Sequence, residues 1–293
     1  NEGIEINNRL DIILQYINNK LYNTEVKVKL SKKTHESILE LTHSVSLDKN
    51  EIFQVLFMFY CNKKTKLNLD QYYTPYTICK FLGALMVPGK SVIDPACGTG
   101  DLVKCYDGQI SLWDVSKDVL EVCVQNYELN NKLDDCNIRN INSIVENELD
   151  NNTYDYCCLN PPFGSSTVIT NKDILETYEI GKGEKKVEIG LLFIERALRL
   201  VKIGGIVSII LPNGYLGNST RMILKLKKYL LSMRIIGIIE LPENSFSRSG
   251  TGVSTSILIV QRIKTDKPYN IFIKKLDNIG YILNKKNTPY KYK

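Results

Sequence analysis

Histidine is scarce in this sequence, since only His35 and His43 occur among 293 residues, both in the N-terminal quarter. A histidine base or a histidine-bound metal therefore has little support, and we expect no metal. The cysteines include no C-x-x-C pair, which argues against a zinc site and a small disulfide framework. Apolar runs stay shorter than the ~18–20 residues that a membrane helix needs, and the first residues lack the features of a secretion signal. We expect a cytoplasmic protein that contacts no membrane.

The composition is sufficient for a full hydrophobic core, because 43% of the residues are hydrophobic and 24% are charged. Positive charge is concentrated at one end. Residues 262–293 carry nine Lys or Arg and two acids, so their net charge of +7 exceeds the net charge of +6 of the whole chain. This basic segment either contacts phosphate groups or is a solvated linker, and the sequence leaves both interpretations open.

The organisation of the chain changes near residue 70. Before it, apolar residues recur at helical spacing, and Asp48 with Glu51 forms a capping-box pattern, which predicts a helical domain over residues 1–70. Thr74-Pro75 predicts the start of a further helix that runs to Met86. Beyond residue 90, strand and helix patterns alternate, which predicts a doubly wound, mainly parallel α/β sheet.

Seven short apolar runs are the predicted strands of this sheet: Ser91–Asp94, Ile110–Trp113, Asn137–Ile141, Tyr154–Leu159, Gly205–Leu211, Arg234–Leu241 and Ser254–Gln261. Predicted helices lie near residues 100–106, 116–130, 188–202 and 218–231. The last strand follows a connection too short for a crossover helix, so we expect it to pair antiparallel. Gly164–Val187 is a polar loop of unusual length. The lysines of its Gly181–Lys186 segment either track nucleic-acid phosphate or are simply solvated.

Asn160-Pro161-Pro162-Phe163 follows the fourth predicted strand. The Asn160 amide oxygen and the Pro161 carbonyl both accept hydrogen bonds, while Pro161 and Pro162 lack an N–H and restrict the backbone. Phe163 offers an aromatic face, and stacking on a base is worth roughly 1–3 kcal/mol. The motif suits the presentation of an exocyclic amine of a planar substrate to an electrophile. The alternative is a Pro-rich turn with only a structural role.

A glycine-containing loop, Asp94–Gly100, follows the first predicted strand. Gly98 and Gly100 allow the backbone to approach a ligand closely. The loop lacks the lysine and hydroxyl residue of a phosphate-binding loop. An acid at the strand end suits a cationic amino-acid group, which favours S-adenosylmethionine over a nucleotide phosphate. The alternative is a turn that serves packing alone.

Polar residues also end the next two predicted strands. Asp114 is suited to the hydroxyls of a ribose, although a helix-capping role competes with that interpretation. Asn142 and Ser143 are candidates for the adenine edge of a cofactor.

Several motifs in this order resemble the N6-adenine DNA methyltransferases, specifically the modification subunits of type I restriction systems and their fused single-chain relatives. The motifs are Gln71–Pro75, Asp94–Gly100, Asn160–Phe163, Gly204–Gly214, Leu241–Phe246 and Gly250–Leu258. The resemblance implies an S-adenosylmethionine-dependent methyltransferase domain with a seven-stranded sheet over residues 71–262. It is preceded by the helical domain, residues 1–70, and followed by a basic extension or linker, residues 263–293, toward a missing recognition region.

The resemblance also implies roles for individual residues. Asn160 and Pro161 engage the amine of a flipped adenine, Pro162 completes the motif, and Phe163 stacks on the base. Phe246 is a second candidate for stacking, with a core position as an equal alternative. The implied cofactor-binding set is Tyr73, Thr74, Asp94, Ala96, Gly98, Thr99, Gly100, Asp114, Asn142 and Ser143. Family members usually carry an aspartate where this chain has Asn142, so that contact is expected to be weaker.

The implied activity is methyl transfer from S-adenosylmethionine to the N6 amine of adenine in double-stranded DNA, within a restriction-modification system. We expect sequence choice to lie in a specificity subunit or in a C-terminal recognition domain absent from this chain. Alternative substrates are a protein glutamine amide or an RNA amine. A further alternative is a non-catalytic subunit that binds DNA or S-adenosylmethionine. No nuclease motif stands out, so we expect no DNA cleavage by this chain.

Overall fold

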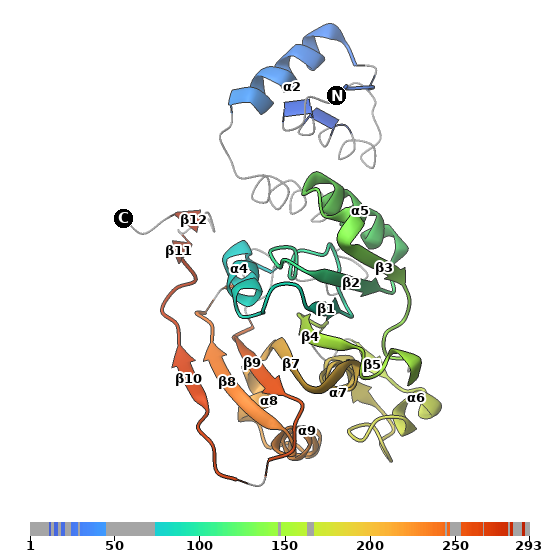
Figure 1. The fold of residues 1–293 in the computed structure, drawn as a ribbon, viewed down its shortest axis with the longest axis vertical. Coiled ribbons are helices and arrows are strands. Elements are labelled where there is room, and N and C mark those ends of the chain that lie inside the picture. Colours follow the sequence, from blue (N-terminus) through green and yellow to red (C-terminus); the bar gives the residue numbers. More distant parts are fainter. Residues whose placement is uncertain are drawn as a thin grey trace. The chain divides into compact units, whose positions relative to one another are not determined.

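The computed structural model describes residues 12, 15–16, 19–20, 25–28, 30–44, 74–145, 148–162, 167–243, 245–246, 253–265, 267–280, 282–283 and 289–290. The chain divides into two compact units, residues 1–69 and 70–293. In the first unit the structure describes helix α2 (Lys32–Ser44) and a few residues that precede it (Figure 1). The predicted capping box at Asp48 lies outside the described residues.

The second unit contains an eight-stranded sheet in the order β10-β8-β9-β7-β4-β1-β2-β3. Its strands are β1 (Ser91–Asp94), β2 (Gln109–Asp114), β3 (Cys136–Asn140), β4 (Tyr154–Leu159), β7 (Val201–Pro212), β8 (Arg234–Glu240), β9 (Thr255–Gln261) and β10 (Phe272–Lys275). All seven predicted strands are present. Strand β9 pairs antiparallel with β7 and β8, as its short connection predicted, and the other neighbouring strands pair parallel.

The eighth strand changes the interpretation of the C-terminal segment. Phe272–Lys275 fall in the predicted extension or linker, yet they pair in register with Gly237–Glu240 of β8 and form an edge of the sheet (Figure 1). Lys275 also donates to Glu240 at 3.0 Å. Further along, β11 (Ile282–Leu283) and β12 (Pro289–Tyr290) form a separate two-stranded ladder. Part of residues 263–293 is therefore integrated into the sheet rather than acting as a linker.

Helices lie on both faces of the sheet, and each face has its own cluster of buried hydrophobic residues. Helices α4 (Tyr76–Ala84) and α5 (Lys117–Leu129) contribute to one cluster, whereas α7 (Ile189–Leu200) and α9 (Arg221–Leu231) contribute to the other. Successive strand residues point to opposite faces. In β4, accordingly, Cys157 and Leu159 join one cluster and Cys158 joins the other. Shorter helices are α8 (Asn213–Gly217), η1 (Leu133–Asp135) and η2 (Glu148–Asp150).

The helix predicted near residues 100–106 is wrong, because this segment is a series of turns. Its backbone N–H groups bond three residues back, as from Lys104 to Asp101 and from Tyr106 to Val103. The backbone enters the segment at positive φ, +53° at Gly98 and +77° at Gly100. Buried side-chain bonds then hold it in a non-helical path, and they are described with the site below.

The long segment after Asn160 has structure of its own. It contains β5 (Val168–Ile169), α6 (Lys172–Glu176) and β6 (Val187–Glu188), with β5 and β6 paired antiparallel. The buried carboxylate of Glu195 on α7 accepts bonds from the backbone N–H groups of Glu179 and Ile180 at 2.8 and 2.9 Å. The predicted loop is therefore fastened to the sheet-packing helix over its described part.

Candidate functional site

The candidate site lies at the carboxyl edge of three adjacent parallel strands, β2, β1 and β4. Asp94 ends β1, Asp114 ends β2, and Asn160 directly follows β4. Open α/β sheets bind ligands at this edge. The structure therefore brings three of the sequence-predicted residues to one edge, although 66 positions separate Asp94 from Asn160 in the sequence.

Asp94 is buried, with only 1% of its surface exposed. The pKa of this carboxyl is raised to about 8, and burial is the main cause. The bond from the Ala96 N–H at 3.1 Å acts in the opposite direction and lowers the pKa, while the charge of Asp114 adds to the rise. A carboxyl in such a site favours a cationic ligand, since a nearby positive charge would stabilise its ionised form. The site fits the cationic amino group of S-adenosylmethionine.

Asp114 connects the glycine loop to the start of α5. Its Oδ2 accepts from the Gly98 N–H and its Oδ1 from the Ser116 N–H, both at 2.9 Å. Burial raises the pKa of Asp114. Ser116 is the N-cap residue of α5, and no side chain caps this helix end, so the bond from Ser116 N–H to Asp114 is a turn before the helix and not a cap. Each carboxylate oxygen keeps a second lone pair, which can accept a ribose hydroxyl.

The glycines of the loop have different surroundings. A β-carbon on Gly98 would meet no described atom within 4 Å, whereas one on Gly100 would lie 2.6 Å from Cys123 Sγ. Gly98 thus borders open space at positive φ, where a ligand can approach the backbone. Gly100 instead packs closely against α5, which agrees at that position with the alternative of a turn that serves packing.

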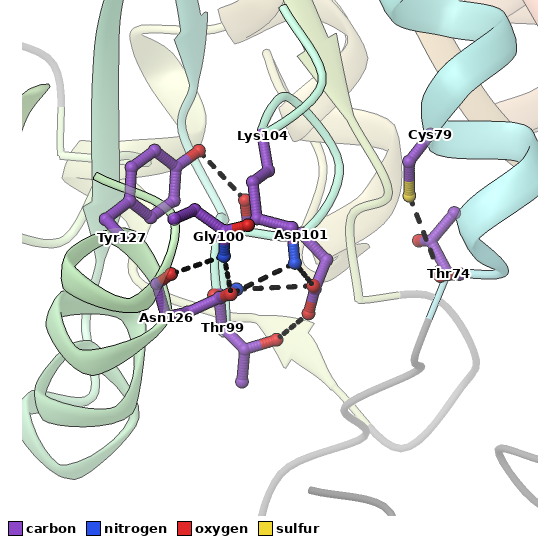
Figure 2. Close-up of polar contacts among 9 residues, drawn as sticks. Thr74, Cys79, Thr99, Gly100, Asp101, Lys104, Asn126 and Tyr127 are labelled. Atoms are coloured by element: carbon purple, nitrogen blue, oxygen red, sulfur yellow. Dashed lines mark hydrogen bonds and ion pairs between the residues drawn. The ribbon is translucent and has the colours of Figure 1, made fainter. Parts of the chain in front are cut away.

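A buried polar network lies beneath the glycine loop (Figure 2). Lys104 Nζ donates to Asp101 Oδ1 at 2.9 Å and to Asn126 Oδ1 at 3.0 Å. The Thr99 hydroxyl donates to Asp101 Oδ2 at 2.6 Å, and Asn126 Nδ2 donates to the Thr99 carbonyl at 2.8 Å. The Thr99 side chain, predicted to bind cofactor, is therefore engaged inside the protein. Sequence reasoning missed Asp101, Lys104 and Asn126, because no motif links α5 to the loop.

Ser143 also bonds within the protein. Its hydroxyl donates to the Pro95 carbonyl at 2.6 Å, and its own carbonyl accepts from Arg196 Nε at 2.9 Å. Asn142 Oδ1 accepts from the Ile144 N–H at 3.1 Å. The Ser143 hydroxyl thus ties the segment after β3 to the glycine loop, and the buried Arg196 of α7 supports it. Sequence patterns assigned no role to Arg196.

The two ends of the Asn160 side-chain amide differ in their hydrogen bonding within the described part of the chain. Its Nδ2 donates to Thr74 Oγ1 at 3.0 Å. Its Oδ1 is buried and has no hydrogen-bond partner among the residues that the structure describes. A buried acceptor without a partner costs about 1–3 kcal/mol, and folded proteins seldom tolerate it. Asn160 therefore presents an acceptor that a ligand donor would satisfy.

Three other predicted site residues either lie outside the described residues or are buried in the core. Tyr73 and Phe163 lie outside the described residues. Phe246 is only 1% exposed and belongs to the same core cluster as α4 and α5. This placement supports the core alternative for Phe246, because a buried ring has no free face for a base to stack on.

No group of three or more His, Cys, Asp or Glu is arranged to hold a metal ion in the described part of the chain. No described helix is both long and apolar enough to span a membrane.

Comparison with known proteins gives the chain a family context. The family model described as N-6 DNA Methylase matches residues 50–292. The methylase subunit of the type I restriction enzyme EcoEI from Escherichia coli is 27% identical over 215 residues, which cover 65% of this chain and 42% of that protein. The rRNA N(6)-adenosine-methyltransferase metl-5 from Caenorhabditis elegans is 25% identical over 154 residues, covering 49% of this chain and 64% of that protein. The chain thus spans less than two thirds of either relative.

Solved structures share the fold. A protein from Listeria monocytogenes, assigned as a class I S-adenosylmethionine-dependent methyltransferase, superimposes with a TM-score of 0.68 at 21% identity, covering 91% of this chain and 85% of that one. A modification subunit from Vibrio vulnificus, assigned to a type I restriction enzyme, gives a TM-score of 0.61 at 21% identity, covering 78% and 53%. The predicted α/β methyltransferase fold is confirmed, and so is the resemblance to type I modification subunits.

Proposed function

The chain belongs to the N-6 DNA methylase family, and from this we propose that it methylates the N6 amine of adenine in double-stranded DNA, with S-adenosylmethionine as cofactor. The observation that carries the proposal is the buried Oδ1 of Asn160, which lacks a partner among the described residues. An amine hydrogen of the substrate would supply the missing donor.

The residues around the cofactor would contribute in different ways: by charge, by backbone access and by hydrogen bonding. S-adenosylmethionine supplies an electrophilic sulfonium methyl group when bound. Asp94 would hold its amino group, because an ammonium beside the buried carboxyl stabilises the charged form. Gly98 would allow the loop backbone to approach it, and Asp114 would accept from ribose hydroxyls while keeping its two backbone bonds. Thr99 and Ser143 would act by holding the loop in shape.

The amine-facing residues act through their carbonyl groups. The N6 lone pair of adenine is delocalised into the ring, so hydrogen bonds from the amine to Asn160 Oδ1 and the Pro161 carbonyl favour a more tetrahedral nitrogen. Positive charge then develops on N6 during transfer, and preorganised carbonyl dipoles stabilise it. Phe163 would stack on the extruded base, which offsets part of the few kcal/mol that leaving the duplex costs.

A recognition partner is part of the proposal. Both restriction-enzyme relatives are named as subunits, and the E. coli protein is longer than the matched region. We propose that a specificity subunit, or a recognition region outside this sequence, selects the target within a restriction-modification system. An RNA amine is the second candidate substrate, favoured by the similarity to an rRNA N6-adenosine methyltransferase.

The test is transfer of labelled methyl from S-adenosylmethionine to unmodified plasmid DNA, ribosomal RNA and protein, each with and without a type I specificity subunit. We expect N6-methyladenine in DNA. Asn160→Ala should lower the rate about 100-fold or more, as loss of a preorganised electrostatic group does. Asn137→Ala is the matched control, because Asn137 is exposed on the edge strand β3.

Other outcomes are equally informative. Label in RNA but never in DNA would replace the substrate with the second candidate. Label that is unchanged by Asn160→Ala would refute the proposed chemistry. Binding of S-adenosylmethionine without label in any substrate would indicate a non-catalytic subunit.

A further inference from the structure

We propose that Thr74 is a positioning residue whose hydroxyl aims the Asn160 carbonyl oxygen at the reacting amine. The inference rests on the proposed function but concerns a separate contact. Asn160 Nδ2 donates to Thr74 Oγ1 at 3.0 Å, between residues 86 positions apart. Thr74 is only 5% exposed, so water has little access to replace this bond. Family resemblance assigns Thr74 to the cofactor, whereas the structure pairs it with the amine-binding side chain.

The orientation of the amide decides what the substrate meets. An asparagine side chain ends in an acceptor and a donor group of nearly equal shape. Its terminal torsion is broad and roughly two-fold, so Asn160 by itself does not choose which end faces the substrate. With Nδ2 turned toward Thr74, Oδ1 is left as a buried acceptor that has no partner among the described residues. A half-turn would present a donor to the amine and remove the attraction.

Thr74 is itself held on a rigid support. It precedes Pro75, which restricts its backbone to extended conformations, and Pro75 has φ −53° and ψ 134° at the N-cap of α4. The Thr74 carbonyl accepts from Cys79 Sγ at 3.7 Å (Figure 2). Helix α4 is anchored by Ile78 and Leu82 in the core. The hydroxyl therefore has a defined position, which a positioning residue requires.

The direction of the hydrogen bond leaves Thr74 one further capability. Its Oγ1 accepts from Asn160, so the hydroxyl hydrogen points elsewhere and remains able to donate. An uncommitted O–H could donate to Oδ1 of a flipped amide, so Thr74 fixes the orientation of Asn160 when its hydroxyl hydrogen donates to the bound cofactor while Oγ1 accepts from Asn160 Nδ2. Because the Thr74 hydroxyl acts mainly on the orientation of Asn160, its loss should slow methyl transfer more than it weakens cofactor binding.

Thr74→Val removes the hydroxyl with little change of shape, and Thr74→Ser keeps it. The assays are the single-turnover rate of methyl transfer to unmodified DNA at saturating S-adenosylmethionine, and the dissociation constant of the cofactor by calorimetry. For Thr74→Val we expect a rate about 10–100-fold lower, since misplacement of a reacting group has effects of this size. The dissociation constant should change less than about threefold, and Thr74→Ser should restore the rate.

Thr77→Val is the matched control. Thr77 lies in the first turn of α4, three residues after Thr74, and its buried hydroxyl has no partner among the described residues. The same substitution there should leave both measurements near wild type. Weaker cofactor binding with an unchanged saturated rate in Thr74→Val would overturn the proposal and make Thr74 a cofactor ligand alone. An unchanged rate and affinity would overturn it as well.

A second readout separates this inference from the proposed function. The side-chain amide hydrogens of Asn160 can be followed by NMR hydrogen exchange, with their signals assigned by comparison with Asn160→Asp. They should exchange slowly in the wild type and Thr74→Ser, and faster in Thr74→Val. If the wild type labels no DNA, the proposed function fails while this measurement still decides the Thr74 contact. Equal exchange in all three proteins would overturn the contact whatever the substrate.

Discussion

Lys104→Met should destabilise the protein by about 3–5 kcal/mol, the cost of leaving a buried charge without its partner. Lys104 Nζ lies 2.9 Å from Asp101 Oδ1, and the two side chains are only 2% and 5% exposed. Methionine keeps the apolar stem but removes the charge and the bonds to Asp101 and Asn126. Since almost no solvent reaches the Asp101 carboxylate, we expect the loss to fall in the upper part of that range.

The assay is urea unfolding followed by circular dichroism, with cofactor affinity measured by calorimetry on the same proteins. The expected loss is a large share of the roughly 5–15 kcal/mol that stabilises an ordinary domain. Lys117→Met, on the exposed face of α5, is the control and should change stability by less than about 0.5 kcal/mol. Cofactor affinity should also fall in Lys104→Met, because the network holds Thr99 in the glycine loop.

The double variant Asp101→Asn, Lys104→Met tests the physical reason. It removes both charges, while the new amide can still bond to Thr99 and Asn126, so it should recover much of the stability that Lys104→Met loses. A loss below about 1 kcal/mol in the single variant would refute the reasoning. A double variant less stable than the single one would refute it too.

Three further predictions concern the site and its surroundings. Cofactor affinity should rise about tenfold per unit as pH increases toward 8, because burial raises the Asp94 pKa to about 8 and the free protein must release a proton to bind an ammonium group. Calorimetry across pH 6–9 measures this, and Asp94→Asn should abolish the slope; an equal slope in that variant would rule out Asp94 as the cause. Gly100→Ala should lower the melting temperature more than Gly98→Ala, since its β-carbon would lie 2.6 Å from Cys123 Sγ while that of Gly98 meets no described atom within 4 Å. Similar melting temperatures would contradict this account of the loop. Phe246→Ala should cost about 3–5 kcal/mol in urea unfolding, as for a core aromatic. A small loss of stability with slower base extrusion, followed by 2-aminopurine fluorescence in DNA, would instead support stacking.

Local sequence patterns predicted the strands well because each strand is a short apolar run between turn-forming residues. The antiparallel pairing of β9 followed from the length of its connection, which is also a local property. Strand β10 was missed for the opposite reason. Its residues, Phe272–Lys275, are exposed and show no burial pattern, so only their pairing with β8 defines them as a strand. The false helix near residues 100–106 has a similar cause, because a lysine, an aspartate and a distant asparagine on α5 determine its path.

The chemistry at the ends of the strands could be read from the sequence alone: a carboxyl after β1, another after β2, and an acceptor-rich turn after β4. Residue type and order suffice for that. Only the tertiary structure decided which of these groups are already engaged. Thr99 and Ser143 direct their hydroxyls into the protein, Phe246 lies in the core, and Asn160 alone of these keeps a buried acceptor unpaired among the described residues. The physical reason is that burial and hydrogen-bond direction depend on neighbours that are distant in sequence, as Thr74 is from Asn160.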